Sequence, residues 1–174
     1  MDNNGQFTIK NTEISPETFD HEVGDVIFLN SARFDVRTNE TLSVYGNWSN
    51  GYEFASGTNA LVLFEGDNTA QVFGSNSFSV LTITNAGKRM EFESGMTNEV
   101  REGLTLFGAV GDNILIRPIT ASSHTYFSIA AAVIPALENL DVAYNDASPG
   151  ITLPAQSSVD GGNNVNWTFE SGAQ

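Results

Sequence analysis

The stretch LVLFEGDNTAQVF, Leu61–Phe73, contains the pattern that decides the fold: an apolar strand, a turn of glycine, aspartate and asparagine, and a second apolar strand. The pattern returns along the chain, and the leading strands of its copies begin 19, 20 and 23 residues apart. These leading strands are Leu42-Ser43-Val44, Leu61-Val62-Leu63, Leu81-Thr82-Ile83 and Leu104-Thr105-Leu106. A repeat of this length is typical of a solenoid, in which each repeat buries its apolar face against its neighbours. The sequence predicts an all-β solenoid.

Side chains are expected to alternate between core and solvent along each strand, because the side-chain period of a β-strand is two residues. The residues predicted to point inward in the first two repeats are Leu42, Val44, Leu61 and Leu63. The segment Ile129–Pro135 is apolar enough for a helical turn, but its β-branched residues and its proline favour a buried strand.

The last third of the chain is expected to close the solenoid. Leu140 and Val142 alternate inward in one more strand, and Trp167 and Phe169 follow the final glycine-rich turn. Stacked coils have no built-in stop, so a lid of large apolar side chains is needed at the end. The predicted divisions are a lead-in segment or N-terminal cap at 1–23, β-helix coils at 24–136, and a final coil with closing segment at 137–174.

Composition limits the classes of partner. The chain has 174 residues, with seven basic against 21 acidic side chains and a net charge of −14. Nucleic acids and anionic membranes require clustered lysine and arginine, so neither is an expected partner.

With no cysteine, the chain has no disulfide and no zinc–thiolate site. No apolar run reaches the roughly 18 residues of a membrane span, and Met1–Gly5 lacks the pattern of a signal peptide. We expect a module excised from a longer protein.

Five segments resemble repeats of large bacterial surface proteins that contain right-handed parallel β-helices. They are LSVYGNWSNGYEF at 42–54, LVLFEGDNTAQVFG at 61–74, FSVLTITNAG at 78–87, LDVAYNDAS at 140–148 and SVDGGNNVNWTF at 158–169. The resemblance covers about residues 24–169, and its most specific part is the closing motif. It implies a right-handed parallel β-helix with a C-terminal closing segment. It also implies a bacterial extracellular or cell-surface location, structural or adhesive duties, and no catalytic residues.

Acidic side chains are the candidates for catalysis, since some parallel β-helices cleave polysaccharides with converging carboxylates. The densest acidic group comprises the residues at 65, 91, 93, 99 and 102, with Arg89 and Arg101. Glu91 and Glu93 flank Phe92, so both face outward if Phe92 belongs to the core. We expect a solvated face here and no enzyme.

Oxygen-rich turns near the C-terminus are the candidates for a metal site. Asp141, Asp146 and Asp160, with Asn145 and Asn163, could supply oxygen ligands for calcium. The alternative is that these side chains bond the backbone of their own turns. Calcium is the sole cofactor that the sequence suggests, because His21 and His124 lie far apart and no cysteine accompanies them.

An aromatic strip is the candidate for ligand binding. Tyr45, Trp48 and Tyr52 could form an exposed surface on which sugar rings stack; the alternative is that Trp48 covers a loop against the coil.

Two functions remain open. The first is a non-catalytic structural or adhesive module that assembles end to end into a homo-oligomer or filament. The second is a module that binds polysaccharide on a lateral face, with polysaccharide cleavage as a further alternative.

Overall fold

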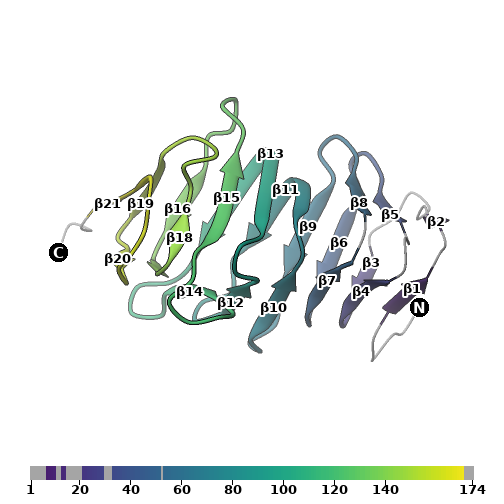
Figure 1. Ribbon diagram of the computed structural model, residues 1–174, viewed down its shortest axis with the longest axis horizontal. Coiled ribbons are helices and arrows are strands. Elements are labelled where there is room, and N and C mark those ends of the chain that lie inside the picture. Colours follow the sequence, from purple (N-terminus) through teal and green to yellow (C-terminus); the bar gives the residue numbers. More distant parts are fainter. Residues whose placement is uncertain (1–6, 11–12, 15–20, 30–32, 52, 171–174) are drawn as a thin grey trace.

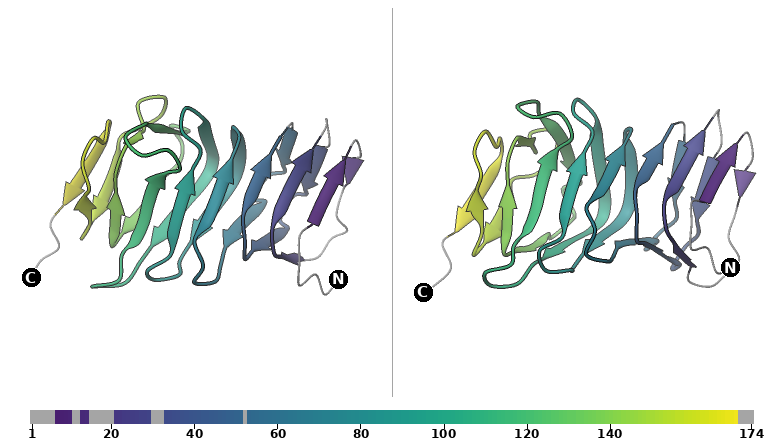
Figure 2. Two further views of the ribbon diagram at one scale, coloured as in Figure 1. Left: turned by 60° about the horizontal axis from the view of Figure 1, so that its bottom comes forward. Right: turned by 90° about the horizontal axis from the view of Figure 1, so that it is seen from below.

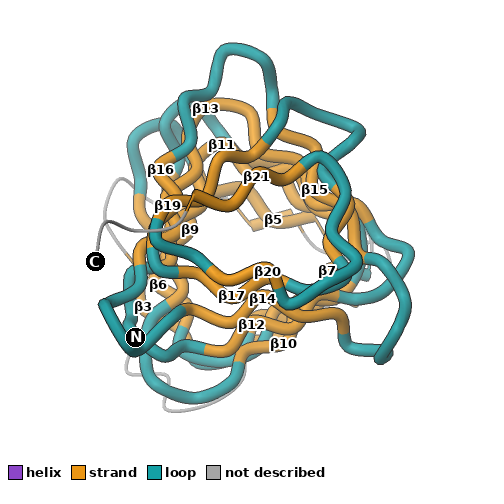
Figure 3. The backbone as a smooth tube through the Cα atoms, turned by 90° about the vertical axis from the view of Figure 1, so that its left-hand side faces the viewer, coloured by secondary structure: helices purple, strands orange, loops and turns teal. Residues whose placement is uncertain are grey.

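A computed structural model of the chain describes residues 7–10, 13–14, 21–29, 33–51 and 53–170. The described residues form an all-β solenoid whose coils stack along the longest axis, as Figures 1 and 2 show. Every pairing between named strands is parallel, and each coil presents three faces. Viewed from the C-terminal end, the chain runs anticlockwise towards the viewer, which is the right-handed sense (Figure 3). No helix among the described residues has the length and apolar character needed to span a membrane.

The first face is a sheet of eight strands that begins with β1 and ends with β20. Its strands are β1 (Phe7–Lys10), β4 (Val26–Leu29), β7 (Trp48–Asn50), β10 (Ala70–Phe73), β12 (Arg89–Phe92), β14 (Ile114–Pro118), β17 (Leu140–Val142) and β20 (Val159–Asp160). Figure 3 shows the strands β10, β12, β14, β17 and β20 of this sheet along the lower side of the cross-section.

The second face carries shorter or shared strands. They are β2 (Glu13–Ile14), β5 (Arg33–Val36), β8 (Glu53–Ser56), the first halves of β11 (Asn76–Ile83) and β13 (Thr97–Phe107), β15 (Thr125–Ile129) and β18 (Asn145–Asp146). The two long strands run from the second face into the third, where the rest of each continues the ladder.

The third face is completed by one strand from each remaining coil. Besides the second halves of β11 and β13, it contains β3 (His21–Val23), β6 (Thr41–Val44), β9 (Leu61–Phe64), β16 (Ala136–Glu138), β19 (Leu153–Gln156) and β21 (Trp167–Glu170). Apolar residues at the same register in successive coils form stacks inside the solenoid. One such stack is Val44, Phe64, Ile83, Leu106 and Leu137, all buried.

The structure confirms the predicted fold and the inward position of several residues. Leu42, Leu140, Val142 and Phe92 are buried. It corrects the phase of the 61–64 strand, in which Val62 and Phe64 are buried while Leu61 and Leu63 are partly exposed. All four residues are apolar, so alternation alone could not fix the phase; the register with Leu42 and Val44 does.

The segment 129–135 is also corrected. β15 ends at Ile129, and a turn and loop follow until β16 begins at Ala136. Val133 is buried, but Ile134 is 93% exposed. Val133 and, in part, Ala130 pack against the core, while the rest of the loop is turned to solvent despite its apolar composition.

The closing segment covers the C-terminal end of the core. The rings of Trp167 and Phe169 stack with centroids 5.9 Å apart, and both pack against the buried cluster. Trp167 lies 6.4 Å from Phe127 and donates its indole N–H to the Asn145 side-chain oxygen at 2.9 Å.

Candidate functional site

The second face is interrupted between β8 and β11, and we call this interruption the seam. The three-stranded sheet β2–β5–β8 ends at β8, and no ladder joins β8 to β11 within the part of the chain that the structure describes. Beneath the seam the rings of Trp48, Phe54 and Phe78 pack together, with centroids 4.7 to 5.5 Å apart. The core is therefore continuous beneath the seam, although the ladder of backbone pairs is not.

A β-bulge aims two charged side chains at the seam. In the β11–β13 ladder Phe78 pairs with Val100, but Val80 pairs with Gly103. Ser79 therefore faces two residues, Arg101 and Glu102. An extra residue of this kind bends its strand and redirects its side chains.

Arg101 bonds the last residue of β8, and Glu102 bonds the turn that follows β8. Arg101 Nη2 donates to the Ser56 carbonyl oxygen at 2.5 Å, and the Ser79 backbone N–H donates to Ser56 Oγ at 3.0 Å. Glu102 Oε2 accepts the Asn59 backbone N–H at 2.5 Å and the Ser79 hydroxyl. The hydroxyl of Ser79 and then the N–H of Asn59 hold the pKa of Glu102 below its usual range. These contacts close one end of the seam.

The other end of the seam is closed by asparagines. Asn50 Nδ2 donates to the Ser75 carbonyl at 2.9 Å, and Asn76 Nδ2 donates to the Gly74 carbonyl at 3.0 Å. Asn76 also links to the core, where its oxygen accepts the Trp48 indole N–H at 2.7 Å. Its amide donates to Asn98 Oδ1 at 2.9 Å. Both amide hydrogens and the oxygen of the buried Asn76 side chain thus have hydrogen-bond partners, and these bonds fix the position of the seam wall.

An open cavity of about 400 Å³ begins at the asparagine end of the seam and extends over the outer side of β11, β13 and β15. Seven of its eight lining residues carry a hydroxyl, amide or carboxylate group and the eighth is Phe54, but more of the exposed lining surface is apolar than polar. The lining residues are Asn50, Phe54, Ser75, Asn76, Ser77, Thr97, Glu99 and Ser128. Within it Ser77 Oγ donates to Glu99 Oε2 at 2.5 Å. Apart from Glu99, sequence reasoning missed these residues, because single serines and asparagines on outward positions are ordinary in β-solenoids.

The acidic group noted in the sequence is divided among different surfaces. Glu99, Arg101 and Glu102 lie at the seam, whereas Arg89 and Glu91 lie on the first face. There Glu91 accepts from Arg89 Nε at 2.7 Å and from Gln71 Nε2 at 2.9 Å. The outward position expected for Glu91 agrees with the burial of Phe92. The structure does not bring the five acids together.

The Glu91 contacts predict a dependence of stability on pH. The Gln71 amide and then Arg89 lower the pKa of Glu91 in the folded state. The stabilisation is therefore present above the unfolded pKa of about 4.3 and is lost as the pH falls through the lower folded value. Because the pair is partly exposed, we expect Glu91→Gln to cost less than about 1 kcal/mol at pH 7 and almost nothing at pH 3. Urea unfolding at both pH values measures the two differences, and an equal cost at both would contradict this origin.

The predicted exposed aromatic strip is wrong for Trp48. This residue begins β7, pairs with Val26 and Val72, and is fully buried. Because both partners point into the core, the indole does too, and it cannot stack on a sugar. Tyr45 is 40% exposed, and Tyr52 lies outside the described residues.

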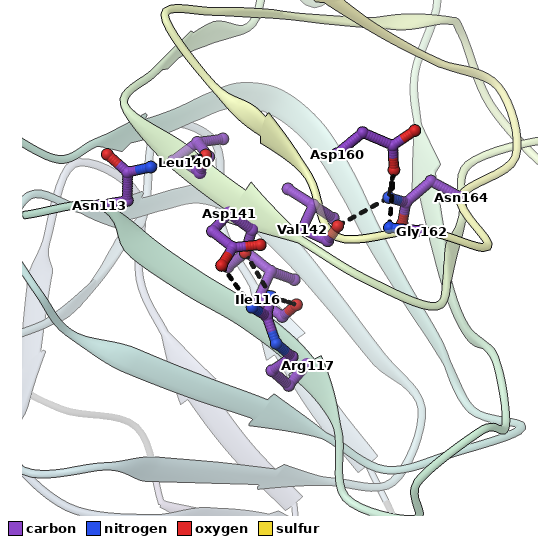
Figure 4. A network of polar contacts seen from close by, with 9 residues as sticks. All are labelled: Asn113, Ile116, Arg117, Leu140, Asp141, Val142, Asp160, Gly162 and Asn164. Carbon is purple, nitrogen blue, oxygen red and sulfur yellow. Dashed lines mark hydrogen bonds and ion pairs between the residues drawn. The ribbon is translucent and has the colours of Figure 1, made fainter.

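The three acids proposed for calcium do not share one site. Asp141 and Asp160 lie on adjacent strands of the first face, while Asp146 lies in β18 on the second. Asp141 forms an ion pair with Arg117 at 2.6 Å, and Asp160 Oδ1 accepts from the backbone N–H of Gly162 at 2.9 Å (Figure 4). Asp146 Oδ1 accepts from Ser148 N in its own turn. Across the described residues no three His, Cys, Asp or Glu side chains converge as a metal site.

His124 and Lys88 have structural partners. His124 Nε2 is 2.8 Å from the Asn163 carbonyl, and the side chain of His21 lies outside the description. The buried Lys88 ammonium donates to the carbonyls of Glu65, Gly66 and Asn68 at 2.8, 2.8 and 3.1 Å. Desolvation lowers the pKa of Lys88, and Asp67 opposes this shift. The ammonium fixes the turn of the preceding coil.

Comparison with known proteins adds no relative. The chain matches no family model, no curated protein and no solved structure among those with which it was compared.

Proposed function

We propose that this chain is a non-catalytic structural and adhesive module of a bacterial extracellular or cell-surface protein, and that copies of it stack end to end. The observation that carries the proposal is that, among the described residues, the outermost strands at both ends of the solenoid pair with no further strand. Among the described strands, β1 and β3 begin the two long sheets, and β20 and β21 end them.

The open edges at the two ends are complementary. All the strands run parallel, so β1 and β3 of a second copy have the direction needed to continue the ladders beyond β20 and β21. Unpaired strand edges are ready templates for pairing with another chain. Since the two ends differ, each contact leaves a further open end, and the result is a filament rather than a closed dimer.

The C-terminal coil offers apolar contact area for such stacking. Val159 and Val165 are 50% and 41% exposed, and they lie in the last coil beside the half-buried lid residues Trp167 and Phe169. The lid seals the interior, while the two valines stay on the surface.

Charge favours contacts at the ends over contacts along the sides. The net charge of −14 makes copies repel one another when they approach side by side. Stacking at the ends brings together fewer of these charges per contact. The expected assembly is a single rod whose width is that of one solenoid.

Replacing both terminal valines with lysine tests the assembly. Lysine on an edge is a known way of preventing strand pairing, so Val159→Lys/Val165→Lys should reduce the association constant at least about tenfold. Light scattering over a concentration series measures the mean mass. The matched control is Val110→Lys, at a residue 91% exposed on a lateral turn, which should assemble as the unaltered chain does. A wild-type mass that stays at 18.7 kDa at every concentration would contradict self-assembly.

Carbohydrate binding on a lateral face is the second candidate function. The specific observation in its favour is the cavity at the seam, whose lining is rich in hydroxyl and amide groups. A rigid solenoid that presents such a cavity is suited to adhesion, so the two functions are compatible.

A further inference from the structure

We infer that the seam cavity binds a short segment of a neutral saccharide. This inference rests on the second candidate function, carbohydrate binding, and it assigns that function a site and a ligand class. The site lies on the second face beside the seam and extends over β11, β13 and β15, and it is not the aromatic strip that the sequence suggested.

The lining matches the chemistry of sugar hydroxyls, each of which both donates and accepts hydrogen bonds. Serine and threonine hydroxyls do the same. The amides of Asn50 and Asn76 already bond neighbouring carbonyls, so they hold the wall of the cavity in place. A carboxylate has about four acceptor positions, so Glu99 can accept sugar hydroxyls while it holds Ser77. The buried Phe54 reaches the cavity with only a small part of its ring, which offers an apolar contact for the C–H groups of a sugar.

The cavity suits a compact ligand better than an extended peptide. A peptide bound by strand addition needs a free backbone edge along its length. At the seam, Ser79 N–H and Arg101 already bond Ser56, and Asn50 already bonds the Ser75 carbonyl. A volume of about 400 Å³ is near the lower limit of the ligand pockets usual in proteins, which are about 300 to 1,000 Å³. A cavity of this volume has room for one or two sugar residues.

Charge selects a neutral saccharide. Glu99 lies in the lining, and the whole chain carries a net charge of −14. Uronic acids and sialic acids would meet electrostatic repulsion at this site, whereas neutral hexoses meet none.

The experiment is a binding screen with the whole chain. The probes are neutral hexose oligosaccharides (glucan, mannan and galactan fragments), uronic acid oligosaccharides, and a peptide array. Hits are then measured by calorimetry with two seam variants, Ser128→Tyr, which fills the cavity, and Glu99→Ala, which removes an acceptor from an exposed residue. The control is Thr82→Tyr, the same kind of enlargement on the third face, outside the cavity. Thermal melting verifies that each variant is folded.

We expect a neutral oligosaccharide to bind, both seam variants to weaken it at least about tenfold, and Thr82→Tyr to leave it unchanged. If a saccharide binds equally well to the seam variants, carbohydrate binding stands and the seam is the wrong site. If no saccharide binds the unaltered chain, both the site and the second candidate function are overturned. Preference for uronic acid oligosaccharides, or binding of peptides alone, overturns the ligand class.

Discussion

Phe92→Asp is expected to unfold the central coils of the solenoid. Phe92 is 1% exposed, lies in register with Val72 and Pro118, and contacts the Phe127 ring at 5.0 Å. A carboxylate there would be buried without a partner, and losses of this kind exceed about 4 kcal/mol. For a chain of this length such a loss lowers Tm by roughly 10 °C. Thermal melting followed by circular dichroism measures it.

The control for this prediction is the same substitution at an exposed phenylalanine. Phe107 is 44% exposed at the end of β13, so Phe107→Asp should lower Tm by less than about 3 °C. A wild-type Tm in Phe92→Asp would show that the register of the central coils is wrong.

Trp48→Ala is expected to cause the second large loss. The indole is fully buried among Phe54, Phe64 and Phe78, and removing it leaves a cavity that costs about 3 to 5 kcal/mol. The substitution also leaves the oxygen of the buried Asn76 without its donor, which adds about 1 to 3 kcal/mol. Urea unfolding measures the total.

Trp48→Phe separates the two causes. It keeps an aromatic ring in the core but removes the N–H that Asn76 accepts, so a loss of about 1 to 3 kcal/mol should remain. Equal stability of Trp48→Phe and the unaltered chain would contradict a role for this hydrogen bond in fixing the seam.

The repeat predicted the solenoid because its spacing reports one property of every coil, the return of an apolar strand to the same face. Leu140, Val142 and Phe92 were placed correctly because polar residues mark the alternation: Asp141 separates Leu140 from Val142, and glutamates flank Phe92. In Leu61–Phe64 every residue is apolar, and the inward pair depends on which residues of β6 lie alongside. Register is a property of two coils, and one strand does not encode it.

Trp48 shows a second limit. Its sequence neighbours Asn47, Ser49 and Asn50 are polar and suggest a surface loop. The indole is held inside by residues remote in sequence, Phe78 and Asn76. The seam was missed for the same reason. The bulge at Arg101 and Glu102 is a shift in the pairing of β13 with β11, and the sequence of β13 alone does not show it.

Electron microscopy of the purified chain tests the central claim, end-to-end stacking of a rigid solenoid, most directly. Light scattering reports mass alone, whereas negative-stain images distinguish rods from side-by-side clusters. The account predicts unbranched rods of uniform width that lengthen with concentration and shorten to single particles in Val159→Lys/Val165→Lys. Single particles of the unaltered chain at every concentration, or sheets formed by lateral contacts, would contradict it.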